Sequence, residues 1–162
     1  MRRLHLILRA GLTNLIKKTK FYLKNLLKIH NMTKYLEIEE VLIIHEETIK
    51  LFGGTEGILN FNSLHAAVER SKATFGKEDL YPTVFEKAAA LLQSLIMNHP
   101  FNDGNKRTAI TCVARFLLIN NWDLNLPIEK SIQFTLDISS HTFSFERTVK
   151  WLKDHSIKIK FC

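Results

Sequence analysis

Apolar residues recur at helical spacing over most of the chain from residue 39 onward. In residues 39–52 the apolar positions suit one face of a helix, and Gly53 and Gly54 follow directly. Glycine accepts the left-handed backbone conformation that often ends a helix. The pattern therefore predicts a helix over residues 39–52.

Two longer segments, residues 82–99 and 105–122, are rich in apolar residues: the first is apolar nearly all round over residues 88–97, and the second is mostly apolar. A helix that is apolar all round is a buried one, so both segments are predicted to lie at the centre of the domain. We expect Pro82 in the first turn of the first helix. Pro100 should end that helix, because proline disfavours helical geometry in the residue before it.

Shorter segments complete a mainly helical pattern. Asparagine and serine, which cap helix N-termini, precede two of them, and proline opens the third. They are residues 63–70 (capped by Asn62 or Ser63), 127–139 and 145–155 (capped by Ser144). Residues 72–81 predict a short hairpin or flap, and residues 122–126 a short extended piece. The predicted fold class is mainly α: a single compact helical domain with a short β-hairpin flap.

The first 31 residues differ from the rest in charge. They hold eight lysines and arginines and no acidic residue, which leaves fifteen basic and sixteen acidic residues in the remainder of a chain of net charge +7. Because that remainder is close to neutral, we expect no general electrostatic binding of nucleic acid. Basic residues also interrupt the N-terminal apolar run, so neither a membrane span nor a secretory signal is predicted.

Met32 opens a segment that resembles a domain start, and we divide the chain there into a basic leader, residues 1–31, and a domain, residues 32–162. We interpret the leader as a reading frame that begins upstream of the true start, or as a disordered or helical extension. A basic helix on an anionic membrane surface is the alternative. Cys112 and Cys162 have no recognisable disulfide spacing, which favours the cytoplasm.

The turn "NHPFNDGNKRTAI", residues 98–110, gathers charged groups between the two buried helices. Gly104 lets the backbone approach a ligand closely, and residues 105–108 supply the unpaired N–H groups of a first helical turn, which attract anions. Arg107 can form two parallel hydrogen bonds to phosphate, and Lys106 adds a mobile charge. The predicted phosphate site is Gly104, Asn105, Lys106 and Arg107.

Three further residues of the turn suggest a reaction. Asp103 places a carboxylate in this positive site, which suits a Mg²⁺ ion that bridges two phosphates of a nucleoside triphosphate. His99 carries an imidazole, which can take a proton from an attacking hydroxyl near neutral pH. Phe101 is expected to turn inward and anchor the loop. Taken alone, Asp103 could simply cap the next helix, but the spacing of the other charged residues favours catalysis.

The sequence does not contain a complete zinc-protease motif or a P-loop. His45 and Glu46 begin a zinc-protease motif, but Ile49 stands where the second histidine is required. No zinc site is therefore predicted. The chain also lacks a G-x-x-x-x-G-K-[ST] motif, so any ATP is bound without a P-loop.

The segment "HPFNDGNKR", residues 99–107, resembles the signature of the Fic/Doc superfamily. The wider similarity, over about residues 33–153, is to its death-on-curing (Doc) branch of toxin–antitoxin toxins. Two positions are similar to the Doc branch: residue 106 is a lysine, and residue 110 is isoleucine and not the second arginine of Fic proteins. Gly104 resembles Fic proteins more generally.

The resemblance implies a Fic/Doc helical domain that acts as a toxin. It would transfer phosphate from Mg-ATP to a hydroxyl of a translation protein similar to elongation factor Tu. His99 would be the general base, Asp103 the Mg²⁺ ligand and Arg107 part of the catalytic phosphate site, with residues 72–81 as the platform for the target. The alternatives are Fic-type AMP transfer, although Ile110 cannot hold a leaving phosphate, and a non-catalytic binding module.

The resemblance also implies a small antitoxin that lays an inhibitory helix across the nucleotide site. Residues 33–37 and 142–146 loosely echo the S/T-x-x-x-E part of such a helix, but neither is followed by the required glycine or asparagine. We therefore expect inhibition by a separate protein.

Overall fold

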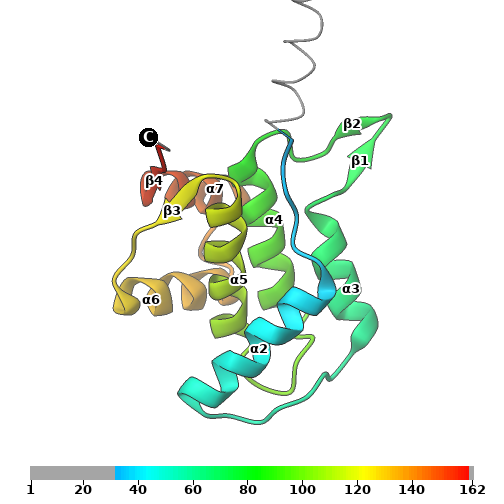
Figure 1. The fold of residues 1–162 in the computed structure, drawn as a ribbon, viewed down its shortest axis with the longest axis vertical. Helices are drawn as coiled ribbons and strands as arrows, with labels where there is room; N and C mark the ends of the chain where they lie inside the picture. Colours follow the sequence, from blue (N-terminus) through cyan, green and yellow to red (C-terminus); the bar gives the residue numbers. More distant parts are fainter. Residues whose placement is uncertain (1–31, 161–162) are drawn as a thin grey trace, which may run out of the picture. The chain divides into compact units, whose positions relative to one another are not determined.

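Two buried helices, α4 (Val84–Met97) and α5 (Asn105–Ile119), form the centre of the computed structural model, which describes residues 32–160. They lie side by side and are joined by a short loop, residues 98–104 (Figure 1). Ten of the fourteen residues of α4 are buried. The prediction of two central helices is thereby confirmed.

A capping box fixes the start of α4. Thr83 Oγ1 accepts a hydrogen bond from the Glu86 N–H at 3.2 Å, and the Glu86 carboxylate accepts one from the Thr83 N–H at 2.7 Å. The two bonds satisfy donors that a helix start leaves unpaired. Pro82 therefore precedes the cap and does not lie in the first turn as predicted.

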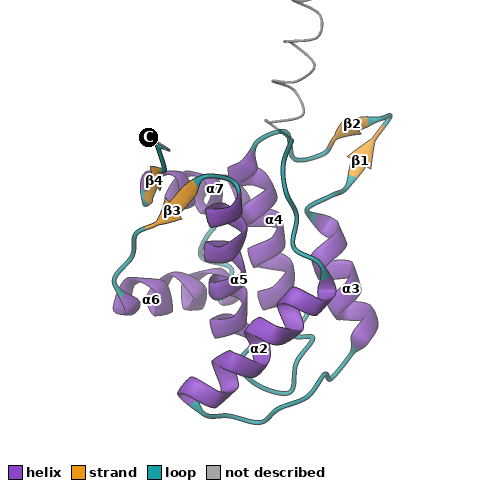
Figure 2. Cartoon of the chain, in the orientation of Figure 1, coloured by secondary structure: helices purple, strands orange, loops and turns teal. Residues whose placement is uncertain are grey.

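The other helices of residues 34–160 surround this pair, and the fold is mainly α as predicted (Figure 2). They are α2 (Ile38–Phe52), α3 (Phe61–Arg70), α6 (Ile128–Ser139) and α7 (Phe145–Asp154). Helix α2 packs on α5, α3 and α7 pack on α4, and α6 contacts both central helices. Asn60, not Asn62 or Ser63, caps α3, because its Oδ1 accepts from the Ser63 N–H at 3.0 Å.

Two small antiparallel sheets complete the described part of the chain. Strands β1 (Thr74–Phe75) and β2 (Glu78–Asp79) form the predicted hairpin around Gly76. Strand β3 (Trp122–Leu124) pairs with β4 (Ser156–Lys158). Strand β3 lies within residues 122–126, which were predicted to be extended, whereas β4 was not predicted.

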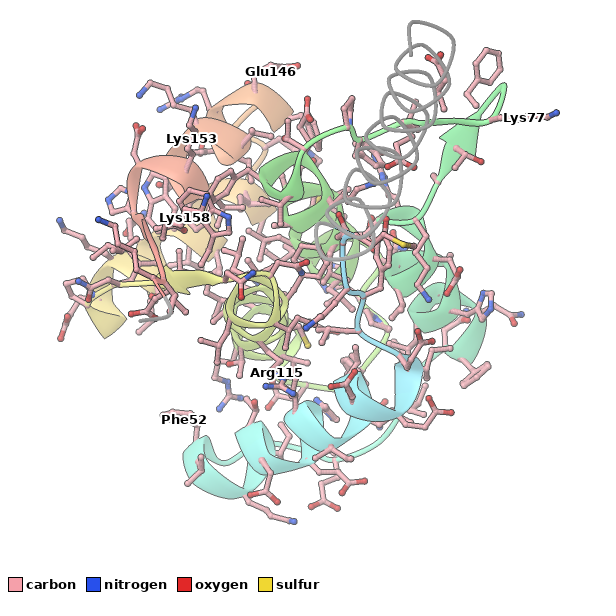
Figure 3. The ribbon with its side chains drawn as sticks, turned by 45° about the horizontal axis from the view of Figure 1, so that its top comes forward. Phe52, Lys77, Arg115, Glu146, Lys153 and Lys158 are labelled. Atoms are coloured by element: carbon pink, nitrogen blue, oxygen red, sulfur yellow. The ribbon has the colours of Figure 1, made fainter. Side chains whose placement is uncertain are left out.

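The hairpin lies at the far end of α4 from the loop of residues 98–104. Asp79 in β2 pairs with Lys87 in the first turn of α4, whereas the loop follows the last turn. Fourteen helical residues rise about 20 Å. Figure 1 shows the hairpin near the start of α4 and the loop at its other end, and in Figure 3 Lys77, at the hairpin tip, points away from the helices. The expectation that residues 72–81 form a platform beside the loop is wrong.

Within residues 32–160, no helix is both long and apolar enough to cross a membrane. The predictions for the basic leader, residues 1–31, lie outside the described residues, and the division at residue 32 stays a prediction.

Lys87 gives a test of how the hairpin is held. Its side chain is only 1% exposed, and its Nζ lies 2.8 Å from Asp79 Oδ2 and 5.6 Å from the centre of the Tyr35 ring. Asp79→Asn would leave a buried ammonium without its counter-charge, so we expect the free energy of unfolding to fall by about 1–3 kcal/mol. Denaturant titration measures the change. Glu78→Gln on the same strand is the matched control, and equal small effects of both variants would contradict this role of Asp79.

Candidate active site

Phe101 anchors the middle of the loop between α4 and α5. Its side chain is 1% exposed and lies in the main hydrophobic core. The side chain of Asn105 closes the turn around it: Oδ1 accepts from the Phe101 N–H at 3.0 Å, and Nδ2 donates to the Phe101 carbonyl at 2.8 Å. Asn105 was predicted to bind phosphate, but its side chain is engaged in the turn. Only its backbone N–H is available to a ligand.

A second segment, residues 53–60 between α2 and α3, runs alongside this loop. Ile58 and Phe101 form an antiparallel bridge, and the Asn102 N–H donates to the Gly57 carbonyl at 3.1 Å. A Cβ on Gly57 would lie 2.8 Å from Asn102 Nδ2, and one on Gly54 would clash with the Asp103 carboxylate. Gly54 and Gly57 also hold φ values of 128° and 115°, which L side chains rarely adopt, so the backbone favours glycine at both positions. Residues 53–60 occupy the place beside the loop that was expected of the hairpin.

A cavity of about 370 Å³ whose lining residues are mainly polar or charged, the polar cavity, lies over the loop and the start of α5. Six of the seven predicted site residues line it, and the seventh, Phe101, lies in the core. The six are His99, Asp103, Gly104, Asn105, Lys106 and Arg107, with Asn102 and residues of α6 completing the wall. His99 is exposed and adopts a φ of 44°, a conformation that non-glycine residues rarely hold.

The first turn of α5 points unpaired donors at this cavity. Gly104, in the left-handed conformation with a φ of 70°, precedes the helix, and the first intrahelical bond runs from the Thr108 N–H to the Gly104 carbonyl at 2.9 Å. The N–H groups of residues 105–107 come before that bond and are open to an anion. Arg107 is held at one end by a bond from Nη1 to the Gly53 carbonyl at 2.9 Å.

Asp103 keeps its negative charge in this setting. Its Oδ1 accepts from the Gly104 N–H at 2.5 Å, and its Oδ2 lies 3.7 Å from Arg107 Nη2. The hydrogen bond from Gly104, a second from the Thr55 N–H and the charge of Arg107 lower the pKa of Asp103, while desolvation opposes them. The carboxylate is therefore ionised at neutral pH.

The donor set around Asp103 suits a magnesium ion that arrives with a nucleotide. Residues 32–160 contain no group of three or more histidine, cysteine or acidic side chains that could hold a metal by themselves. Mg²⁺ commonly binds through one or two carboxylates and the phosphates of its substrate. A single ionised carboxylate beside an anion site fits that mode.

An apolar cavity of about 390 Å³ adjoins the polar one, and Lys106, Arg107, Ile132 and Thr135 line both. Most of its exposed lining is apolar and comes from α2, α5, β3, the segment after β3, and α6. The apolar members are Phe52, Ile110, Ala114, Leu124, Leu126 and Ile132. The site thus offers a charged compartment and an apolar compartment side by side.

His45, which was not predicted to be a site residue, lies directly behind the loop. Its ring is 3% exposed, stacks on Phe101 with 3.8 Å between centroids and 9° between planes, and places Nδ1 3.1 Å from Thr108 Oγ1. The signal was present, because His45 falls on the buried face of α2 with Val41 and Ile49. A histidine on such a face needs a polar partner, which only the structure identifies.

Comparison with known proteins gives the family. Residues 35–117, about half of the chain, match the model of the Fic/DOC family. The chain belongs to the Fic/DOC family. It is 46% identical over 93 residues to "Toxin Doc" of Mycolicibacterium smegmatis (strain ATCC 700084 / mc(2)155), covering 57% of this chain and 69% of that protein. It is also 31% identical over 87 residues to "Protein kinase doc" of Escherichia phage P1, covering 54% and 68%.

The predicted resemblance to the death-on-curing branch is therefore confirmed. Fic/DOC proteins are transferases, and the family implies use of a nucleotide. The matched region runs from α2 through most of α5, so it includes His45, the loop with His99 and all seven predicted site residues. Their individual roles stay predictions.

The burial of His45 should make the stability of the protein depend on pH. Burial lowers its pKa from the ordinary 6.5, with Arg107 adding to the effect and the charges of Glu46, Glu56 and Asp103 opposing it. Below pH 6.5 the unfolded chain therefore binds more protons than the folded one, and stability falls as the pH falls. We expect His45→Phe to lose less free energy of unfolding than the wild type between pH 7.5 and 5.5.

Guanidinium titrations at both pH values measure the difference. The control is His65→Gln, because His65 is exposed and its replacement should leave the pH dependence of the wild type. If His45→Phe and the wild type lost equal stability over this range, the folded protein would not hold His45 in its neutral form.

Proposed function

We propose that this protein is the toxin of a type II toxin–antitoxin system and transfers phosphate from Mg-ATP to a hydroxyl side chain of a translation protein similar to elongation factor Tu. The support comes from the anion site at the start of α5, the ionised Asp103 beside it and the Doc relatives, one of which is named a protein kinase.

The apolar surroundings of Ile110 are the observation that favours phosphate transfer over AMP transfer. Ile110 lies one turn beyond Arg107 and lines the apolar cavity, where a second arginine would otherwise hold the phosphate that leaves in AMP transfer. An apolar compartment suits the nucleotide base and not a phosphate. With the base at that end, the triphosphate extends toward the polar cavity, and its terminal phosphate lies beside His99.

In this arrangement each polar residue has a separate task. The N–H groups of residues 105–107, with Lys106 and Arg107, bind the phosphate oxygens and neutralise the charge that develops on them. Asp103 would hold Mg²⁺, which supplies further charge neutralisation when bound. His99 takes the proton of the target hydroxyl, whose oxygen forms a bond to the terminal phosphorus as the bond to ADP breaks.

We further propose that the target segment lies along residues 53–60. This segment is exposed, and it already contacts the loop through the bridge between Ile58 and Phe101 and the bonds from Asn102. A peptide placed on it would have its hydroxyl close to the polar cavity. The hairpin at residues 74–79 is too distant to serve.

The inhibitory partner is proposed to be a separate antitoxin, as the Doc relatives suggest. Expression of the chain alone should then halt bacterial growth, and His99→Ala should restore it. Growth arrest that persists in a stably folded His99→Ala variant would favour the non-catalytic binding module.

The reaction is tested with ATP labelled on either the α- or the γ-phosphate and elongation factor Tu as the offered protein. We expect γ-label on the target and a loss of at least 100-fold in rate for His99→Ala, a typical effect of removing a general base. His65→Ala, at an exposed histidine of α3, is the control and should retain the wild-type rate. Transfer of α-label would establish AMP transfer instead.

Ile110→Arg tests the orientation of the nucleotide. A guanidinium group in the apolar cavity would occupy the space proposed for the base, so transfer of γ-label should fall at least tenfold. Leu118→Arg, at an exposed position of the same helix, should have no such effect. A gain of α-label transfer in Ile110→Arg, with γ-transfer unchanged, would contradict the proposed orientation.

A further inference from the structure

We infer that His45 is a positioning residue for the transfer reaction, which holds the phosphate site in register through the hydroxyl of Thr108. The expected effect of His45 on the rate of transfer rests on the proposed function. The expected effect of His45 on the loop rests on the structure alone. His45 does not line the polar cavity and is not placed to touch a substrate there.

His45 contacts Phe101 of the loop and Thr108 of α5, and its ring also lies close to the backbone of Gly104 between them. Its ring stacks on Phe101, its Cε1 lies 3.8 Å from where a Cβ on Gly104 would stand, and its Nδ1 meets Thr108 Oγ1. These three residues bracket the N–H groups of residues 105–107 on both sides. Helix α2 therefore forms a wall behind the phosphate site, and His45 supplies the polar contact in that wall.

The hydrogen-bonding groups around His45 and Thr108 indicate which of the two donates the proton in the bond between them. Thr108 is fully buried, and His45 is the one partner of its hydroxyl among residues 32–160. If the hydroxyl donates to Nδ1, the ring proton lies on Nε2, and only that group lacks a partner. The reverse arrangement leaves both the hydroxyl proton and the Nε2 lone pair unsatisfied. The first arrangement is favoured because unpaired buried polar groups are costly.

Packing alone does not explain a histidine at this position. A phenylalanine would stack on Phe101 equally well and would not bury an unpaired Nε2. What the imidazole adds is a directional bond to the second turn of α5, just below the donors that would bind phosphate. That bond fixes the rotation and height of the first turn relative to His99, and catalytic rates are sensitive to such placement.

The test uses the double variant His45→Phe/Thr108→Val in the full chain. Replacing both partners of a buried hydrogen bond with apolar groups of similar shape is nearly neutral for stability. We expect a midpoint of thermal unfolding equal to or above that of the wild type, together with transfer of label from ATP at least tenfold slower. A purely structural role predicts unchanged transfer in this variant.

Three single variants sharpen the comparison. Thr108→Val should lose activity, whereas Thr108→Ser, which keeps the hydroxyl, should retain it. Thr48→Val is the matched control, because Thr48 is also a buried threonine of the wall, but its hydroxyl donates within α2 to the Ile44 carbonyl at 2.7 Å. It should transfer label at the wild-type rate.

If the wild type transfers no label, the proposed function is refuted, but the role of His45 in holding the loop is not. Amide hydrogen exchange tests that role without any transfer of label. The amides of Phe101, Asn102 and Thr108 are hydrogen-bonded in the structure. In the double variant without nucleotide, we expect their exchange to accelerate at least tenfold, while Thr48→Val leaves it unchanged. The inference would be overturned if amide exchange in the double variant equalled that of the wild type. It would also be overturned if the double variant transferred label at the wild-type rate, whether the wild type transfers the α- or the γ-label.

Discussion

The burial of Phe101 holds the site together. The loop between α4 and α5 consists mainly of polar and charged residues, which water would otherwise solvate as a mobile turn. Burying one phenylalanine side chain contributes about 1.5–3 kcal/mol. Because Phe101 sits at the middle of the loop, its burial fixes the backbone on both sides of it, and the side chain of Asn105 completes the turn.

Three separate parts of the chain use this anchored loop as a support. Helix α2 stacks His45 on Phe101, residues 53–60 lie along the loop backbone, and α5 begins at Gly104 with its unpaired donors exposed. The consequence is electrostatic as well as geometric. Asp103 is held ionised beside Arg107, so that a carboxylate and a set of phosphate-binding donors face the same cavity.

The sequence predicted those features that depend on neighbouring residues. Helices α4 and α5 follow from continuous apolar runs, and the charged turn between them is visible as a departure from those runs. The position of the hairpin could also have been predicted, because a hairpin just before α4 and a loop just after it must lie at opposite ends of that helix. The expectation of a platform at residues 72–81 conflicts with this constraint.

The remaining features depend on contacts between distant residues. The bond between His45 and Thr108 joins positions 63 apart. The apolar face of α2 indicates that His45 is buried and needs a polar partner, but no local pattern identifies Thr108 as that partner. Gly53 and Gly54 were interpreted only as the end of the helix over residues 39–52. The structure shows that Gly53, Gly54 and Gly57 all hold positive φ values in the segment that approaches the loop backbone. The engagement of the Asn105 side chain in the turn was likewise invisible, since asparagine suits both a turn and a phosphate site.

The central claim, that an anchored turn presents the first turn of α5 to the end of a triphosphate, is tested most directly by a crystal structure with Mg²⁺ and a non-hydrolysable ATP analogue. The account predicts the terminal phosphate within hydrogen-bonding distance of the N–H groups of residues 105–107 and beside His99, with the base in the apolar cavity next to Ile110. A structure with the base in the polar cavity, or with nucleotide bound away from α5, would contradict it.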